Sequence, residues 1–137
     1  MEFTNYKNLP QEIQRIIDSQ DFIGYVRTYY RNGYGSRFFF KGAANGMLEE
    51  IKKAEEVGRA RYTDNMKTEL QSVCEELFET RNPKGRYELY DFCERNDFDK
   101  TASGYMGYCY LEHIVCQIVV SKEDDYFCRV YFYSKNN

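Results

Sequence analysis

Residues 105–120 read YMGYCYLEHIVCQIVV, and residues 126–132 read YFCRVYF after the polar turn SKEDD. The even-numbered positions of the two runs are Met106, Tyr108, Tyr110, Glu112, Ile114, Cys116, Ile118 and Val120, then Tyr126, Cys128, Val130 and Phe132. Side chains alternate across a strand, so an apolar set that keeps one parity on both sides of a short acidic turn predicts an antiparallel hairpin with one buried face.

The residues before this pattern have mostly helical spacing. A helix is expected to begin near Asn8, which can cap it, and Pro10 in the first turn loses only an amide that would be unpaired anyway. Ile13, Ile16 and Ile17 form one face of this helix. The polar residues that follow are expected to end it.

Three further helices are predicted, over residues 22–33, 47–58 and 63–78. The last is the strongest, because Thr63 or Asp64 can cap it and its apolar stripe is unbroken. The apolar positions of the three helices are Phe22, Val26, Tyr29 and Tyr30; Met47, Leu48, Ile51 and Ala54; and Met66, Leu70, Val73, Cys74, Leu77 and Phe78.

The remaining elements are expected to be strands. Residues 36–41 (SRFFFK) are predicted to form a short extra strand, and residues 86–93 the first strand of the main sheet. Helices first and strands afterwards indicate one α+β domain over residues 1–137, in which an N-terminal layer of about four helices packs on a C-terminal three-stranded antiparallel sheet. Its core is expected to include Val73, Leu77, Ile114, Cys116, Ile118, Val130 and Phe132.

The composition fits one folded domain. The chain has 137 residues, of which 42% are hydrophobic and 18% aromatic, and this apolar content excludes a disordered chain. Its 14 tyrosines exceed what a core of this size needs. Tyrosine carries a rigid apolar ring with a polar tip, so the excess indicates either a binding interface or half-exposed positions on the sheet.

The charge and the cysteine content narrow the class of protein. A formal net charge of -3 gives no overall attraction to nucleic acid or to an acidic membrane, so either would need a local patch. The five cysteines are odd in number and form no C-x-x-C pair, which favours buried reduced thiols over a disulfide framework or a zinc site. No stretch approaches the roughly 20 apolar residues of a membrane helix, so we expect no membrane-spanning segment. We also expect a cytoplasmic protein that holds no cofactor and no metal.

His113 is the first candidate for acid–base chemistry, because histidine titrates near neutral pH. In the predicted strand Glu112 points to the opposite face, and the same-face neighbours Leu111 and Val115 are apolar. Cys109 would lie about 13 Å away along the strand, too far for a hydrogen bond. A half-buried strand histidine is therefore favoured, and a small cysteine and histidine enzyme is the weaker alternative.

Carboxylates gather in three short segments. Asp97 and Asp99, with Glu94, offer oxygens to a hard cation, but their loop lacks the calcium-hand pattern and a solvated connection is favoured. Residues 75–79 and 123–125 add acidic groups that could make a surface competing for a basic nucleic-acid channel, although ordinary solvated faces explain them as well. We count Asp97 and Asp99 as candidates for contact with a partner.

Residues 27–41 (RTYYRNGYGSRFFFK) carry four basic residues, six aromatic residues and no acid. Basic groups for phosphates, interleaved with rings for stacking, are typical of single-stranded nucleic-acid sites. The alternative explanation is that the aromatic side chains of this segment belong to the core and that its basic residues are solvated at the surface. The candidate contact residues of this segment are Tyr29, Tyr30, Arg31, Tyr34, Arg37 and Lys41.

The absence of a catalytic constellation favours a small binding protein that acts stoichiometrically on a protein partner. Inhibitors, immunity proteins and phage or mobile-element blockers of nucleic-acid defence complexes have this size. An inhibitor of a macromolecular partner is therefore our leading expectation. Single-stranded nucleic-acid binding through residues 27–41 is the alternative.

Overall fold

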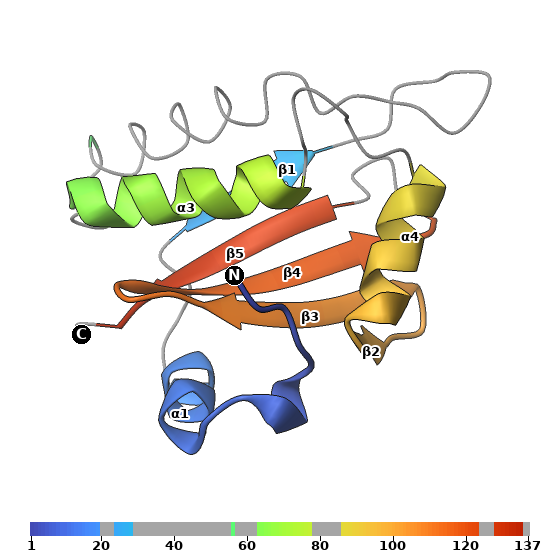
Figure 1. Cartoon of the computed structure of the whole chain (residues 1–137), viewed down its shortest axis with the longest axis horizontal. Helices are drawn as coiled ribbons and strands as arrows, with labels where there is room; N and C mark the ends of the chain where they lie inside the picture. Colours follow the sequence, from blue (N-terminus) through green and yellow to red (C-terminus); the bar gives the residue numbers. More distant parts are fainter. Residues whose placement is uncertain (20–23, 29–55, 57–62, 78–85, 124–127, 136–137) are drawn as a thin grey trace.

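The described part of the chain forms a five-stranded antiparallel sheet with helices on both of its faces (Figure 1). The structure, a computed structural model, describes residues 1–19, 24–28, 56, 63–77, 86–123 and 128–135. The strands are β1 Gly24–Thr28, β2 Asp99–Lys100, β3 Gly104–Tyr110, β4 Ile114–Ser121 and β5 Cys128–Ser134, in the spatial order β1-β5-β4-β3-β2. The helices are the 3-10 turn η1 Tyr6–Asn8, α1 Gln11–Ser19, α3 Asp64–Leu77 and α4 Arg86–Arg95.

One face of the sheet packs against α3 and α4. Helix α3 begins after Thr63, whose Oγ1 accepts a hydrogen bond from the Met66 N–H at 3.2 Å, so Thr63 caps the helix and is the correct one of the two expected caps. The apolar stripe of α3 and the buried residues of α4 form one core with the inward side chains of the sheet. All seven predicted core residues are buried there: Val73, Leu77, Ile114, Cys116, Ile118, Val130 and Phe132.

The opposite face carries a second, smaller core under η1 and α1. Leu9 and Ile13 pack there against Tyr108, Val115 and Tyr133 of the sheet. Figure 1 shows α1 and α3 on opposite sides of the strands. The sheet is therefore covered on both faces, which explains why both parities of its central strands are apolar.

The α+β class, the antiparallel sheet and the first and last of the N-terminal helices are confirmed. Helix α1 contains the predicted Ile13 face, and α3 contains the predicted stripe from Met66 to Leu77. Phe78, the last position of that stripe, lies outside the described residues. The hairpin is confirmed as well, because β4 pairs antiparallel with β5. The even-numbered apolar residues of β4 and β5, such as the pair Ile118 and Val130, lie in the main core.

The predicted strand at residues 86–93 is wrong, because this segment forms helix α4. Leu89, Phe92 and Cys93 are buried at helical spacing, while Asp91 is exposed. The alternation of Tyr87, Leu89 and Cys93 is compatible with a strand. Burial of Leu89, Phe92 and Cys93 together with exposure of Asp91 follows the helical period.

The single strand expected over residues 105–120 is also wrong. The chain turns at Leu111, whose N–H donates to the Ile114 carbonyl at 2.9 Å, and β3 and β4 pair with each other on either side. In their register Cys109 lies opposite Cys116, so odd residues of β3 share a face with even residues of β4. The parity therefore changes at the turn, and the even-numbered Tyr108 packs in the second core rather than the main one.

Residues 24–28, predicted to be helical, form edge strand β1, in which Val26 lies opposite Val130 of β5. A short segment with apolar and β-branched residues fits both the helical and the strand period, and pairing with β5 makes it a strand. The described sheet thus has five strands rather than three. The strand expected at residues 36–41 lies outside the described residues, as does all but residue 56 of the helix expected at 47–58.

Candidate functional site

The basic aromatic candidates Tyr29, Tyr30, Arg31, Tyr34, Arg37 and Lys41 all lie outside the described residues. Only the first two residues of that segment are described, at the end of β1. Nucleic-acid binding through it stays a prediction. The two acidic candidates, Asp97 and Asp99, are described, and both are exposed.

Asp97 ends helix α4. Its φ of 55° is in the left-handed region. The Phe98 N–H donates to the Cys93 carbonyl at 3.0 Å and the Asp97 N–H to the Glu94 carbonyl at 3.2 Å, which is the bonding pattern of a Schellman helix end. The Phe98 ring also packs edge-on against Phe92, 5.9 Å between centroids, and supplies the usual hydrophobic contact of this motif.

Asp99 ties the N-terminal turn to the edge of the sheet. Its Oδ2 accepts a hydrogen bond from the Tyr6 N–H at 3.2 Å, which joins η1 to β2. Within the described ranges, no three histidine, cysteine or acidic side chains are grouped closely enough to hold a metal ion. The structure thus gives Asp97 and Asp99 local structural tasks and leaves their role in partner contact untested.

His113 lies in the turn between β3 and β4, not in a strand as expected. Glu69 of α3 meets it there: its carboxylate accepts from the His113 N–H at 2.8 Å and from the Ile114 N–H at 3.3 Å, and it contacts the ring Nδ1 at 2.5 Å. The side chains of Glu69 and His113 are 15% and 25% exposed. A carboxylate does orient this histidine, but it comes from 44 residues away and also binds the backbone of the turn.

The expectation of buried thiols is confirmed. All five cysteines are free and buried in the main core. Burial raises the pKa of the Cys74 and Cys93 thiols to about 12 and the pKa of the Cys128 thiol well above its ordinary value. A hydrogen bond to Cys109, together with burial, raises the pKa of the Cys116 thiol in the same way. A nucleophilic cysteine needs the opposite, an accessible thiolate with a lowered pKa.

A cluster of tyrosines forms at the end of the sheet where α4 crosses β3. Tyr87 is 69% exposed on α4, and its ring meets Tyr90 edge-on with 6.1 Å between centroids. Tyr90 in turn lies 6.0 Å from the buried ring of Tyr105 on β3. The ammonium group of Lys122, just after β4, lies 5.4 Å from the Tyr90 centroid and 4.8 Å from that of Tyr105, both within cation–π range. We call Tyr87, Tyr90, Tyr105 and Lys122 the tyrosine cluster.

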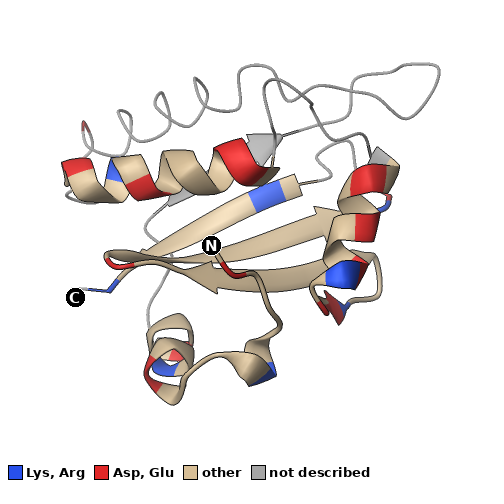
Figure 2. Cartoon of the chain, viewed as in Figure 1, with Lys and Arg blue, Asp and Glu red and all other residues tan. Residues whose placement is uncertain are grey.

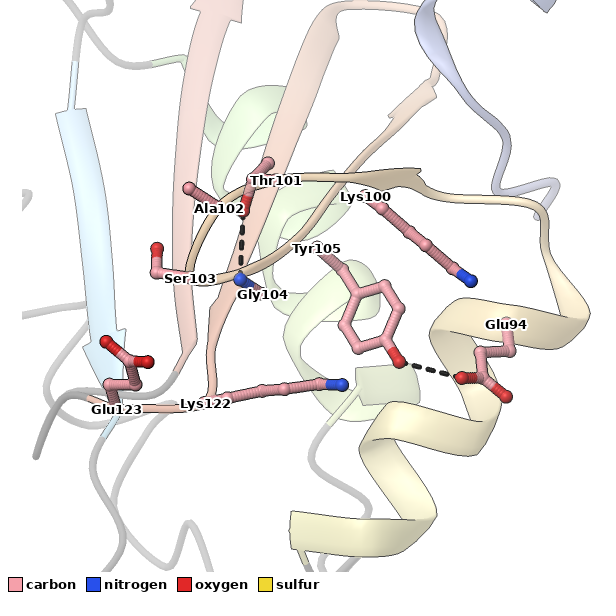
Figure 3. A pocket seen from close by; sticks show the side chains of 9 residues that line it. All are labelled: Glu94, Lys100, Thr101, Ala102, Ser103, Gly104, Tyr105, Lys122 and Glu123. Atoms are coloured by element: carbon pink, nitrogen blue, oxygen red, sulfur yellow. Dashed lines mark hydrogen bonds between the residues drawn. The ribbon is translucent and has the colours of Figure 1, made fainter.

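A pocket of about 220 Å³ opens beside this cluster (Figure 3). Its wall is the short β2–β3 turn, and its lining consists of Glu94, Lys100, Thr101, Ala102, Ser103, Gly104, Tyr105, Lys122 and Glu123. The turn is held tightly, because the Thr101 N–H donates to the Gly104 carbonyl and the Gly104 N–H donates to the Thr101 Oγ1, both at 3.0 Å. Only glycine fits at 104, since a Cβ there would lie 1.8 Å from the Val120 carbonyl oxygen.

Hydrogen bonds raise the pKa of two groups that line the pocket. The Tyr105 hydroxyl donates to Glu94 Oε1 at 2.8 Å, and this bond, with burial, raises the pKa of the phenol above its ordinary value. Hydrogen bonding to Tyr105 raises the pKa of the Lys122 ammonium, with smaller contributions from the charges around it. At neutral pH the phenol is therefore a donor and Lys122 is charged.

The sequence alone does not reveal this site. It predicts a strand for Tyr87 and Tyr90, whereas their three-residue spacing places them on one side of α4. The helical spacing of Leu89, Phe92 and Cys93 is the available signal. No sequence pattern indicates that Lys122 meets Tyr105 or that Glu69 meets His113, because the fold alone brings these distant residues together.

No protein-family model, curated protein or solved structure matches this chain. In the described part of the structure, no helix is both long and apolar enough to cross a membrane. Figure 2 shows acidic residues along both α3 and α4, and all of them except Glu69 are exposed.

Proposed function

We propose that the protein is a binding module that acts by stoichiometric contact with a protein partner, and that the tyrosine cluster is the centre of the contact. The observation that carries the proposal is Tyr87, a large ring left 69% exposed on the surface of α4. Tyrosine is enriched at the energetic centres of interfaces, because it buries much area and loses little conformational entropy.

The support beneath Tyr87 fits an anchor residue. Its ring rests edge-on against Tyr90, which contacts Tyr105, and Lys122 lies over both of the inner rings. A side chain whose neighbours are already packed in the free protein loses less freedom on binding, which favours affinity. Polar groups of the pocket lie beside the rings, as at the rim of an interface.

The candidates Asp97 and Asp99 follow α4 directly and would lie at the edge of such a contact. We further propose that the contact inhibits the partner by covering its working surface. The raised pKa values of the buried thiols also favour contact over turnover by a cysteine nucleophile.

Affinity capture with matched variants tests this function. The wild-type protein, Tyr87→Ala and Tyr110→Ala are used as baits in lysate of the source cells, and retained proteins are identified by mass spectrometry. Tyr110 is the control, because it is also exposed, at 42%, and lies on β3 rather than on α4. We expect one partner to be retained by the wild type and by Tyr110→Ala, and to bind Tyr87→Ala about 30-fold more weakly, the effect of losing about 2 kcal/mol at an interface centre.

A partner that binds Tyr87→Ala as well as the wild type would contradict the proposed contact. A wild-type bait that retains no protein above the level of an unrelated bait would contradict the function itself.

A further inference from the structure

Two of the five core thiols lie side by side on neighbouring strands. Cys109 of β3 is directly opposite Cys116 of β4 in the register of the sheet. Both side chains are fully buried in the main core, and a hydrogen bond joins the two thiols. The two sulfur atoms are therefore already in contact in the folded protein.

The hydrogen bonds of the backbone set the distance between the two residues. The Leu111 N–H donates to the Ile114 carbonyl, so these two residues face each other as a hydrogen-bonded pair. Such pairs recur at every second residue of an antiparallel ladder, so Cys109 and Cys116 form the next one. The Cα atoms of a hydrogen-bonded pair are about 5.5 Å apart, and disulfides span about 4.4–6.8 Å between Cα atoms.

The other three cysteines do not have this placement. Cys74 lies on α3 and Cys93 on α4, while Cys128 of β5 is opposite a valine of β4. All five cysteines belong to the described part of the chain. Cys109 and Cys116 are thus the one pair of cysteines at directly opposite positions of adjacent strands.

We infer that Cys109 and Cys116 are a site of reversible oxidation, at which a small disulfide such as oxidised glutathione generates a disulfide bond between β3 and β4. The inference goes beyond the proposed function and does not depend on it. Both residues are free thiols in the structure, which is therefore the reduced form of the protein. The bond stabilises the oxidised form, because a cross-link restricts the unfolded chain.

The bond forms by two thiol–disulfide exchange steps. One cysteine loses its proton to solvent, and its thiolate attacks a sulfur of oxidised glutathione, which releases one glutathione and leaves a mixed disulfide. The thiolate of the second cysteine then attacks the protein sulfur of the mixed disulfide and releases the second glutathione. The two protein thiols give up two electrons and two protons, and oxidised glutathione is reduced to two thiols. Because both cysteines are buried, the exchange takes place while the core is transiently open.

The spacing of the side chains makes the bond easy to reverse. Cβ atoms of facing residues are about 4.5–5.5 Å apart, with hydrogen-bonded pairs at the wide end, whereas a disulfide has about 3.5–4.5 Å. The bond therefore draws the two strands together and is strained. Strained disulfides are reduced more readily than relaxed ones, so we expect glutathione to cleave this bond again.

A redox titration of the full chain tests the site. The protein is equilibrated at pH 8 with glutathione and oxidised glutathione in varied ratio, starting both from the reduced and from the oxidised form, and is then alkylated with N-ethylmaleimide. We expect a species in which two of the five thiols resist alkylation. Proteolysis after Glu112, which lies between Cys109 and Cys116, should give two peptides joined by the new bond.

The same titration in concentrated urea separates native pairing from closeness in the sequence. Cys109 and Cys116 are near each other along the chain, so the unfolded protein also forms this bond. The ratio of the two equilibrium constants is the factor by which the bond stabilises the fold. We expect the constant to be about tenfold larger for the native protein, below the usual effect of a disulfide because this one is strained.

Alanine variants identify the two partners. Cys109→Ala and Cys116→Ala should each lose the oxidised species at the glutathione ratio that half-oxidises the wild type. Cys74→Ala is the matched control, because Cys74 is also a buried thiol of the main core, and it should keep the bond. Circular dichroism checks that each variant folds, and the peptide map of the wild type decides the pairing even where a variant does not.

Three results would overturn the inference. One is a native protein that keeps all five thiols at every ratio that oxidises the chain in urea. Another is a bond that includes Cys74, Cys93 or Cys128 in place of the proposed pair. The third is an equilibrium constant no larger for the native protein than for the chain in urea, since the fold would then not favour the bond.

Discussion

At the scale of single residues, Asp97 shows how a polar side chain can be explained by backbone conformation. It occupies the left-handed position that ends α4, where glycine is the most favourable residue and aspartate is tolerated. We expect Asp97→Gly to raise the free energy of unfolding by up to about 1 kcal/mol, and Asp97→Val to lower it by about 1–2 kcal/mol, because a β-branched residue is strained there. Urea unfolding of the two variants measures both effects.

The same pair of variants separates structure from recognition, since both remove the carboxylate. If Asp97 contacts the partner, Asp97→Gly loses affinity although it folds more stably. Equal stability of the glycine and valine variants would mean that the backbone at 97 is not held in the left-handed region.

A second residue-scale prediction concerns the carboxylate that binds the β3–β4 turn. Glu69→Ala would leave the N–H groups of His113 and Ile114 without their acceptor, so we expect a loss of about 1–3 kcal/mol in the free energy of unfolding. Glu75→Ala on the same helix is the control, because Glu75 is exposed and its hydrogen bond within the described residues is to Gln71, and it should change stability by less than about 0.5 kcal/mol. Denaturant melts of the two variants give the comparison, and equal losses would refute the anchoring role of Glu69.

At the scale of elements, the sequence predicts best where one period dominates over a long segment. The stripe of α3 recurs over four turns and its cap is explicit at Thr63, so both are predictable. The parity shared by β4 and β5 is predictable because the turn between them is marked by five polar residues. Helix α4 escapes prediction because its short apolar segment fits both the helical and the strand period. The β3–β4 turn escapes it for another reason: both flanks have the strand period, and no glycine or proline at residues 111–113 marks the change of parity between them.

Packing against the rest of the fold decides whether such a segment becomes a helix, a strand or a turn. Tyr87, Leu89 and Cys93 alternate like a strand, but Phe92 and Phe98 must both reach the core at the end of α4. The turn at Leu111 is set by pairing of β3 with β4 and by a carboxylate from α3. The candidate site depends on these same two corrections, so it could not be derived before the elements were placed.

At the scale of the whole molecule, the thiols of the core set an alkaline limit on stability. Cysteine in an unfolded chain ionises near its ordinary pKa, whereas burial raises the pKa of Cys74 and Cys93 to about 12 in the folded protein. Cys116 and Cys128 are raised in the same direction. Above about pH 9 the unfolded chain therefore binds fewer protons than the folded one. The contribution of these thiols to the free energy of unfolding is fully present below that pH, and it is lost as the pH rises toward the pKa values of the folded protein.

The expected size of this effect is large. Each thiol that ionises only on unfolding lowers the free energy of unfolding by about 1.4 kcal/mol per pH unit, and the raised pKa values of Tyr105, Tyr108 and Lys122 act with the same sign. We expect urea midpoints to be flat from pH 7 to about 8.5 and to fall steeply by pH 10. Cys93→Ala should lower stability at pH 7 by leaving a cavity, and it should remove the contribution of one thiol from the alkaline slope.

A thiol reagent such as Ellman's compound gives an independent measure, because the native protein should react only as fast as it opens, while all five cysteines react in denaturant. Rapid labelling of the native protein at pH 8, or an unfolding midpoint that stays constant to pH 10, would show that these thiols are not held in a closed core.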